Sequence, residues 1–260
     1  MDKLREHDGF AGPRHKSAFD PEIFKLVADE MIAEAGVRLR LHTCLAAVEA
    51  ADGRVSRIAV LSKSGLEAVE GDLFIDSTGD GDLCAWAGCQ IEQGRDEDGF
   101  CQPMTLNFRM GGVDLDQLPS REEIDEFYLP AKERGEIDNP RENVLWFPTT
   151  REGEAHFNTT RVVMLDATDA EQMTEAELTA RRQVAQMVAF LKAHVPGMQD
   201  SYLWAMAPQI GIRESRRVIG DHVLTTEEVL RAEKFADGIA RGSYSVDIHN
   251  PAGTGTDIRR

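Results

Sequence analysis

The sequence lacks the marks of a metalloprotein or a membrane protein. Its four cysteines, Cys44, Cys84, Cys89 and Cys101, show no C-x-x-C spacing, which argues against a zinc ribbon or an iron–sulfur cluster within the chain. No apolar run approaches the ~20 residues needed to span a bilayer, and the first ten residues lack an apolar signal core. We expect reduced thiols, no metal site, no membrane partner and a cytoplasmic protein.

Positive charge is also scarce. The 260 residues contain 29 Lys and Arg against 46 Asp and Glu, which gives a net charge of -17. A nucleic-acid backbone or an anionic membrane would be repelled over most of such a surface, so neither is an expected partner. The plain interpretation of the charge is solubility. The length suffices for one large domain or two modest ones with an ample core.

The N-terminal part of the chain predicts a helix followed by a strand. Asp20 stands before Pro21 and Glu22, a strong start signal, because the aspartate caps the helix and the proline fits its first turn. Gly36 marks the end of this helix. Val37–Leu41 then alternates apolar and basic residues, which predicts a strand with one covered face.

A small antiparallel meander is predicted next, with Asp52-Gly53 as its first hairpin turn. A strand at Leu73–Asp76 then leads into a Gly-rich turn and a helix. This order is half of a doubly wound nucleotide-binding domain with the meander as its crossover. We therefore expect Leu73–Ile75 to pair in parallel with Val37–Leu41, and the meander to lie off that sheet. The predicted meander strands are residues 44–48, 55–61 and 66–69.

The predicted pattern of elements changes from about Gln90 onward, where short strands and longer helices alternate without an internal repeat. The longest predicted helix, Thr174–His194, places Leu178, Met187 and Leu191 on its apolar side. This part predicts a mixed α+β domain. Its other predicted strands are at 105–110, 146–148, 156–158 and within 203–224, and its other predicted helices are at 115–136 and 226–232.

The segment DSTGDGDLCAWAG, which begins at Asp76, raises the main functional question. A strand end, two glycines and a helix start are what a phosphate or cofactor site needs, because backbone N–H groups and the helix N-terminus face the ligand. Asp80 and Asp82 would nevertheless repel a phosphate. The alternative is a plain strand-to-helix turn with a capping aspartate.

Three motifs in this order give the chain a family resemblance: the turn above, PQIGIRESRRVIGDHVLT and IARGSYSVDIHNPAGTGT. Together they resemble the FAD-dependent oxidoreductases of the glutathione-reductase type, whose relatives include proteins that resemble the A-type subunit of heterodisulfide reductase. The resemblance implies FAD as cofactor. It also implies that Thr78, Gly79 and Asp80 lie against the FAD, and that Leu45 falls where the family's backbone meets the adenine. Asp80 would cap the next helix or accept a hydrogen bond from a hydroxyl.

The sequence departs from this family at both ends. The G-x-G-x-x-G turn that receives the pyrophosphate occurs nowhere, and the family's C-terminal segment over the flavin ring is missing. We expect an α/β chain with an incomplete doubly wound FAD-binding domain and its β-meander at 1–95, and a mixed α+β substrate or cap domain at 96–260. We expect this chain to be a piece of a longer protein and to retain FAD weakly on its own.

Two further groups of residues are candidate catalytic groups. On a strand through Ile210–Val218, Arg213 and Arg217 share one face, where guanidiniums can bind a substrate carboxylate or sit beside a negatively charged reduced flavin. The alternative is ion pairing with Glu214 across the sheet. His249 can carry a proton near pH 7, or it is a hydrogen-bonding loop histidine.

The resemblance implies flavin-mediated redox chemistry on a small-molecule substrate, with an electron-transfer partner as a possibility. One alternative is a non-catalytic remnant or binding module that has lost the cofactor. Another is an electron-transfer protein similar to the A-type subunit of heterodisulfide reductase, although the cluster cysteines are missing here. The sequence does not indicate the substrate or the oligomeric state.

Overall fold

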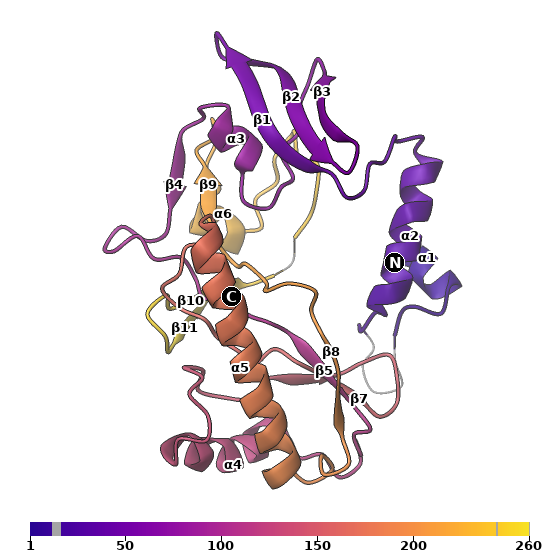
Figure 1. Cartoon of the computed structure of the whole chain (residues 1–260), viewed down its shortest axis with the longest axis vertical. Helices are drawn as coiled ribbons and strands as arrows, with labels where there is room; N and C mark the ends of the chain where they lie inside the picture. Colours follow the sequence, from indigo (N-terminus) through magenta and orange to yellow (C-terminus); the bar gives the residue numbers. More distant parts are fainter. Residues whose placement is uncertain (12–16, 243, 260) are drawn as a thin grey trace. The chain divides into compact units, whose positions relative to one another are not determined.

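A computed structural model of the chain describes residues 1–11, 17–242 and 244–259 (Figure 1). The chain forms two compact units, each built from stretches that are far apart in the sequence. The expected domain boundary between residues 95 and 96 stays a prediction. Unit 1 comprises Met1–Leu39, Pro103–Leu165 and Asp169–Arg213, and unit 2 comprises Arg40–Gln102, Asp166–Thr168 and Glu214–Arg260.

The centre of unit 1 is a four-stranded antiparallel sheet in the order β6-β7-β5-β8. Phe108, Met110 and Phe157 are buried on it, and the rings of Phe108 and Phe157 stack 5.0 Å apart. The strands expected near residues 105–110, 146–148 and 156–158 are therefore confirmed. The strand bounds are β5 Phe108–Gly111, β6 Trp146–Pro148, β7 Glu154–Phe157 and β8 Tyr202–Met206.

Two helices, α4 (Arg121–Glu133) and α5 (Ala170–His194), bury one face each in unit 1. Ser120 and Glu123 form a capping box that starts α4, which fixes its first turn. The ring of Tyr128 on α4 packs edge-on against Phe190 on α5, 5.7 Å between centroids. The prediction for Leu178 is wrong. Its side chain is 53% exposed, because the buried face of α5 runs through positions 176, 180, 184, 187 and 191.

The N-terminal part of unit 1 holds α1 (Asp2–Glu6) and α2 (Pro21–Glu34). The predicted start of α2 is confirmed, since the carboxylate of Asp20 accepts hydrogen bonds from the amides of Glu22 (2.8 Å) and Ile23 (3.4 Å). Gly36 has a φ of 67°, which ends the helix as expected.

Unit 2 contains the predicted meander as a separate three-stranded sheet, β1 (Cys44–Ala51), β2 (Arg54–Ser62) and β3 (Gly65–Glu70). Asp52 and Gly53 both have positive φ, as a tight hairpin turn requires. The other elements of unit 2 are short: α3 Asp82–Trp86, α6 Thr226–Leu230, and the antiparallel pairs β4 (Ile91–Gln93) with β9 (Arg216–Val218) and β10 (Val246–His249) with β11 (Thr256–Arg259).

The predicted parallel pairing is wrong for this structure. Neither Val37–Leu41 nor Leu73–Ile75 is a strand, and the strand pairs in the described ranges are all antiparallel. Leu73 and Ile75 are 81% and 80% exposed, because no strand in the described ranges lies beside them to bury a face or take their backbone hydrogen bonds. The coarser expectation of an α/β chain with several sheets holds.

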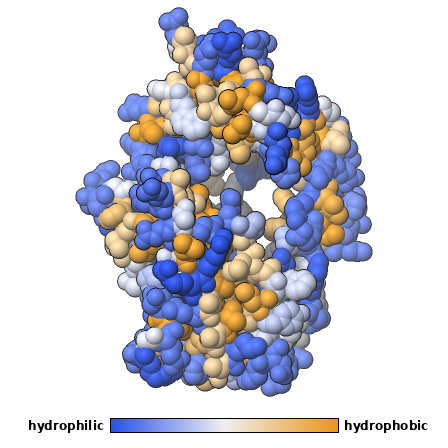
Figure 2. Space-filling model, viewed as in Figure 1, coloured by the Kyte–Doolittle hydropathy of each residue, from blue (hydrophilic) through white to orange (hydrophobic). Residues whose placement is uncertain are grey.

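Apolar residues stand among hydrophilic ones on the face shown in Figure 2.

We predict that Leu191→Ala lowers the free energy of unfolding by about 2–5 kcal/mol, because the side chain is fully buried on α5 and the substitution leaves a cavity. The matched control is Leu178→Ala on the same helix, which should stay within about 0.5 kcal/mol because the side chain is half exposed. Urea unfolding of both variants measures the difference. Equal losses would contradict the described orientation of α5.

Candidate functional site

The Gly-rich turn of unit 2 is organised by the carboxylate of Asp76. Its Oδ1 accepts hydrogen bonds from the amide (3.0 Å) and the hydroxyl (2.8 Å) of Thr78, and its Oδ2 accepts one from the amide of Cys84 (2.9 Å). Burial alone raises the pKa of Asp76, but these hydrogen bonds outweigh it and hold the pKa below its ordinary value. Asp76 therefore stays ionised and ties the segment before the turn to α3.

The two acids that argued against a phosphate both have partners. Asp80 Oδ1 accepts a hydrogen bond from the hydroxyl of Ser215 (2.6 Å), and Asp82 pairs with the guanidinium of Arg216 (2.6 Å). Asp80 thus accepts a hydrogen bond from a hydroxyl within the chain, that of Ser215, and its expected role toward the cofactor stays a prediction. Asp80 does not cap α3, because the N-cap is Gly81 without a side-chain cap.

The turn presents backbone donors at its exposed side. Gly79 has a φ of 89° and open space where a Cβ would stand, so the backbone can be approached closely. Within the described ranges, no hydrogen bond is formed by the amides of Gly79, Asp80 and Gly81. The Asp82 amide, by contrast, donates to the hydroxyl of Thr78 (3.0 Å). Three neighbouring unused N–H groups suit the oxygens of a nucleotide.

Leu45 lies in the same unit as this turn. It is half-buried on β1, opposite Val60 of β2, and α3 packs against β1. The predicted contact of Leu45 with adenine stays a prediction, as do the cofactor contacts of Thr78, Gly79 and Asp80.

The structure does not bring Arg213 and Arg217 onto one strand. Only Arg216–Val218 is a strand, and Arg213 belongs to unit 1 whereas Arg217 belongs to unit 2. Arg217 contacts Glu214, donates to the carbonyl of Gly94 (2.8 Å) and lies 3.8 Å from Glu92 on β4. The predicted shared face is therefore wrong, and ion pairing across the sheet describes Arg217. The catalytic roles of both arginines stay predictions.

Arg213 lies instead near two buried arginines that the sequence reasoning missed. Arg141 and Arg161 are only 6% and 3% exposed. Burial, followed by the positive charges of Arg161 and Arg213, lowers the pKa of Arg141 to about 10. No local sequence signal indicates this group, because its three members are tens of residues apart and meet only in the fold. A group of guanidiniums can stabilise a negative charge.

Hydrogen bonds between distant segments bring this arginine group together. Met104 bridges to Val162, next to Arg161, and Thr105 bridges to Gly211, two residues before Arg213, so both segments run beside residues 104–105. The guanidinium of Arg213 also donates to Thr105 Oγ1 (3.2 Å).

His249 is buried within its own hairpin in unit 2. Its Nδ1 lies 2.9 Å from the hydroxyl of Thr256, and its Nε2 lies 3.6 Å from the carboxylate of Asp247. Its amide donates to Gln102 Oε1 (2.9 Å). These contacts fit a hydrogen-bonding histidine, and the proton-carrying role stays a prediction.

The four cysteines are free thiols in the structure. Burial, followed by the neighbouring Asp76 carboxylate, raises the pKa of Cys84 to about 11, so its thiol stays protonated and unreactive at neutral pH. Of the helices in the described ranges, none has the length and apolarity needed to cross a membrane.

Comparison with known proteins identifies the family. The family described as FAD dependent oxidoreductase matches residues 1–259. The chain belongs to the FAD-dependent oxidoreductase family. Among solved structures, it is similar to a geranylgeranyl bacteriochlorophyll reductase-like protein from Thermoplasma acidophilum, at 13% identity and a TM-score of 0.45. That similarity covers 80% of this chain but only 44% of the other protein. None of the curated proteins compared matches the chain.

Membership of the FAD-dependent oxidoreductase family implies FAD as the cofactor, and the turn in unit 2 fits such a group. The three unused amides and the open space at Gly79 allow close approach, and the partners of Asp80 and Asp82 reduce the repulsion of a phosphate.

We predict that Asp76→Ala lowers the free energy of unfolding by about 1–3 kcal/mol at pH 7, because two amides and a hydroxyl lose an ionised acceptor. The control is Asp72→Ala, a fully exposed acid four residues earlier, which should change little. Thermal or urea unfolding compares the two.

The same variant has an expected pH dependence. The pKa of Asp76 is lower in the folded than in the unfolded state, so its contribution is fully present above the unfolded pKa of about 3.9. The contribution is lost as the pH falls through the folded pKa. The difference between wild type and Asp76→Ala should therefore shrink below about pH 4. A difference that grows on acidification would contradict the role given to the carboxylate.

Proposed function

We propose that the protein is a flavin-dependent oxidoreductase in which the turn of unit 2 holds part of the FAD and a small molecule is the substrate. The observation that carries this proposal is the run of three unused amides at Gly79, Asp80 and Gly81 in a chain of the FAD-dependent oxidoreductase family. Bound FAD would supply the hydride chemistry, and the protein would supply position and electrostatics.

In this proposal the residues of the turn act as a preformed cradle. Asp76 and Thr78 fix the backbone before the cofactor arrives, so little ordering remains to be done on binding. The amides of Gly79–Gly81 donate to oxygens of the nucleotide, and Leu45 contributes apolar contact to the adenine.

The other candidate residues would stabilise charge and transfer protons. The group of Arg141, Arg161 and Arg213 in unit 1 would stabilise negative charge that develops during the reaction. His249, with Thr256 and Asp247 beside its ring, would hold and exchange a proton. Arg217 would support the β4–β9 pair through Glu214 and Glu92, and would contribute charge from that position.

The proposal is tested with Gly79→Ala. A side chain at a φ of 89° is strained, and it would also stand in the space that the cofactor approaches. We expect the Kd for FAD, measured by flavin fluorescence titration of the purified protein, to rise at least about tenfold, or ~1.4 kcal/mol.

The matched control is Gly53→Ala in the meander turn, where φ is 75° and the surrounding space is equally open. This variant should lose a similar amount of stability, about 1–2 kcal/mol, and keep its FAD affinity within about twofold. Equal effects of the two variants on FAD affinity would contradict the proposal, as would a wild-type protein that shows no saturable FAD binding.

A further inference from the structure

Unit 1 contains an open cleft with a volume of about 830 Å³. It lies between the start of α2, the β6–β7 hairpin and the strands β5 and β8. The volume falls in the range of small-molecule sites, and most of the lining is apolar. The large apolar side chains that line it are Phe19, Phe108, Phe147 and Met206.

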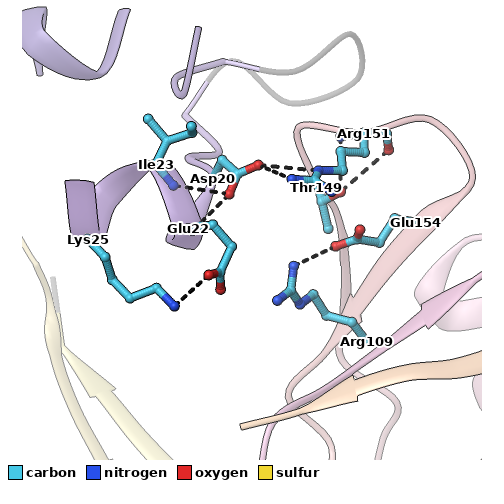
Figure 3. A network of polar contacts seen from close by, with 8 residues as sticks. All are labelled: Asp20, Glu22, Ile23, Lys25, Arg109, Thr149, Arg151 and Glu154. Atoms are coloured by element: carbon cyan, nitrogen blue, oxygen red, sulfur yellow. Dashed lines mark hydrogen bonds and ion pairs between the residues drawn. The ribbon is translucent and has the colours of Figure 1, made fainter. Parts of the chain in front are cut away.

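One wall of the cleft is fixed in place by an ion pair. The guanidinium of Arg151, in the β6–β7 hairpin, donates to Asp20 Oδ2 from Nη2 (2.7 Å) and from Nε (3.2 Å) (Figure 3). The other carboxylate oxygen of Asp20 caps α2. Asp20 is 6% exposed, whereas the Arg151 side chain is half-exposed, so the ion pair is buried on the Asp20 side only. The cleft is therefore built by the fold, with its two sides joined.

The charges that line the cleft cancel. Lys25 pairs with Glu22 (2.5 Å) and Arg109 pairs with Glu154 (2.9 Å), and Figure 3 shows these pairs on facing sides. Burial, with the charge of Arg109, keeps the pKa of His156 below 6.5, so its ring is uncharged at neutral pH. A carboxylate or phosphate ligand would find every lining cation already paired. This balance favours an uncharged ligand.

Asn107 supplies an unused hydrogen-bonding group at the cleft. Its backbone carbonyl accepts from the amide of Ala207 (2.9 Å), which holds the residue in place. Its side-chain Oδ1 is buried and has no hydrogen-bond partner among the described residues. An unpaired buried amide oxygen costs free energy, and a half-turn of the amide exchanges its acceptor and donor. A ligand hydroxyl or amide in the cleft would remove that cost once the Asn107 side chain turns its oxygen toward the ligand.

We propose that this cleft binds an uncharged, largely apolar ring compound that carries one hydroxyl or amide group, with Asn107 as its hydrogen-bond partner. Assigning this ligand as the substrate rests on the proposed function, whereas the binding itself does not. The FAD affinity of Gly79→Ala tests the proposed function, and the affinity of Asn107→Leu for organic probes tests ligand binding in the cleft. Either proposal can therefore fail without the other.

Three probes that share the naphthalene ring test the proposal by calorimetric titration of the purified protein at pH 7: 2-naphthol, 2-methoxynaphthalene and 2-naphthoate. We expect wild type to bind 2-naphthol at least about tenfold more tightly than the other two probes. The methoxy compound cannot donate a hydrogen bond, and the carboxylate must lose its hydration without a spare cation. Asn107→Leu should weaken 2-naphthol binding at least about tenfold and leave 2-methoxynaphthalene within about twofold.

The control is Asn158→Leu, because Asn158 has a buried, unpartnered Oδ1 in the same unit but does not line the cleft. It should leave all three affinities within about twofold of wild type. A second variant, Thr150→Trp, fills the cleft from its loop and should abolish binding of 2-naphthol. The proposal is overturned if 2-naphthoate binds most tightly, if the two Asn variants behave alike, if Thr150→Trp binds normally, or if no probe binds saturably.

Discussion

The carboxylate of Asp76 is the contact on which the candidate cofactor turn depends. One side chain accepts three hydrogen bonds, two from Thr78 and one from the amide of Cys84, and so joins the chain before the turn to the helix after it. The amides between these two anchor points, at Gly79–Gly81, have no hydrogen-bond partners in the described ranges. The turn is thus held at both ends by Asp76, and its middle, at Gly79–Gly81, has the amides that would bind the cofactor.

Two sequence motifs that lie far apart form one structural feature. Ser215 and Arg216, from the RESRR segment, bind the two acids of the Gly-rich turn. In the proposed function this pairing would reduce the repulsion of a nucleotide by the acidic turn, because Asp82 is paired with Arg216 and Asp80 accepts from the hydroxyl of Ser215. Unit 1 differs from this turn: it contains a cleft whose lining charges are paired and, separately, a group of three arginines, of which Arg141 and Arg161 are buried.

Local signals in the sequence predicted local structure well. Asp20 caps α2, and Asp52-Gly53 turns the meander, because each depends on residues within a few positions. The predicted parallel pairing of Val37–Leu41 with Leu73–Ile75 is wrong. An apolar alternation indicates that one face of a segment can be buried, but it does not indicate which other segment covers that face. The arginine group and the role of Asn107 depend on contacts between residues tens of positions apart, such as Met104 with Val162, which no local pattern encodes.

The central claim is that the amides of Gly79, Asp80 and Gly81 are donors kept for the cofactor. Hydrogen exchange of the purified protein, measured residue by residue with and without saturating FAD, tests it most directly. The account predicts fast exchange at these three amides without FAD and clear protection with it, while the amide of Gly53 in the meander turn is unchanged. Exchange at Gly79–Gly81 that is the same in both conditions, under saturating FAD, would contradict the account.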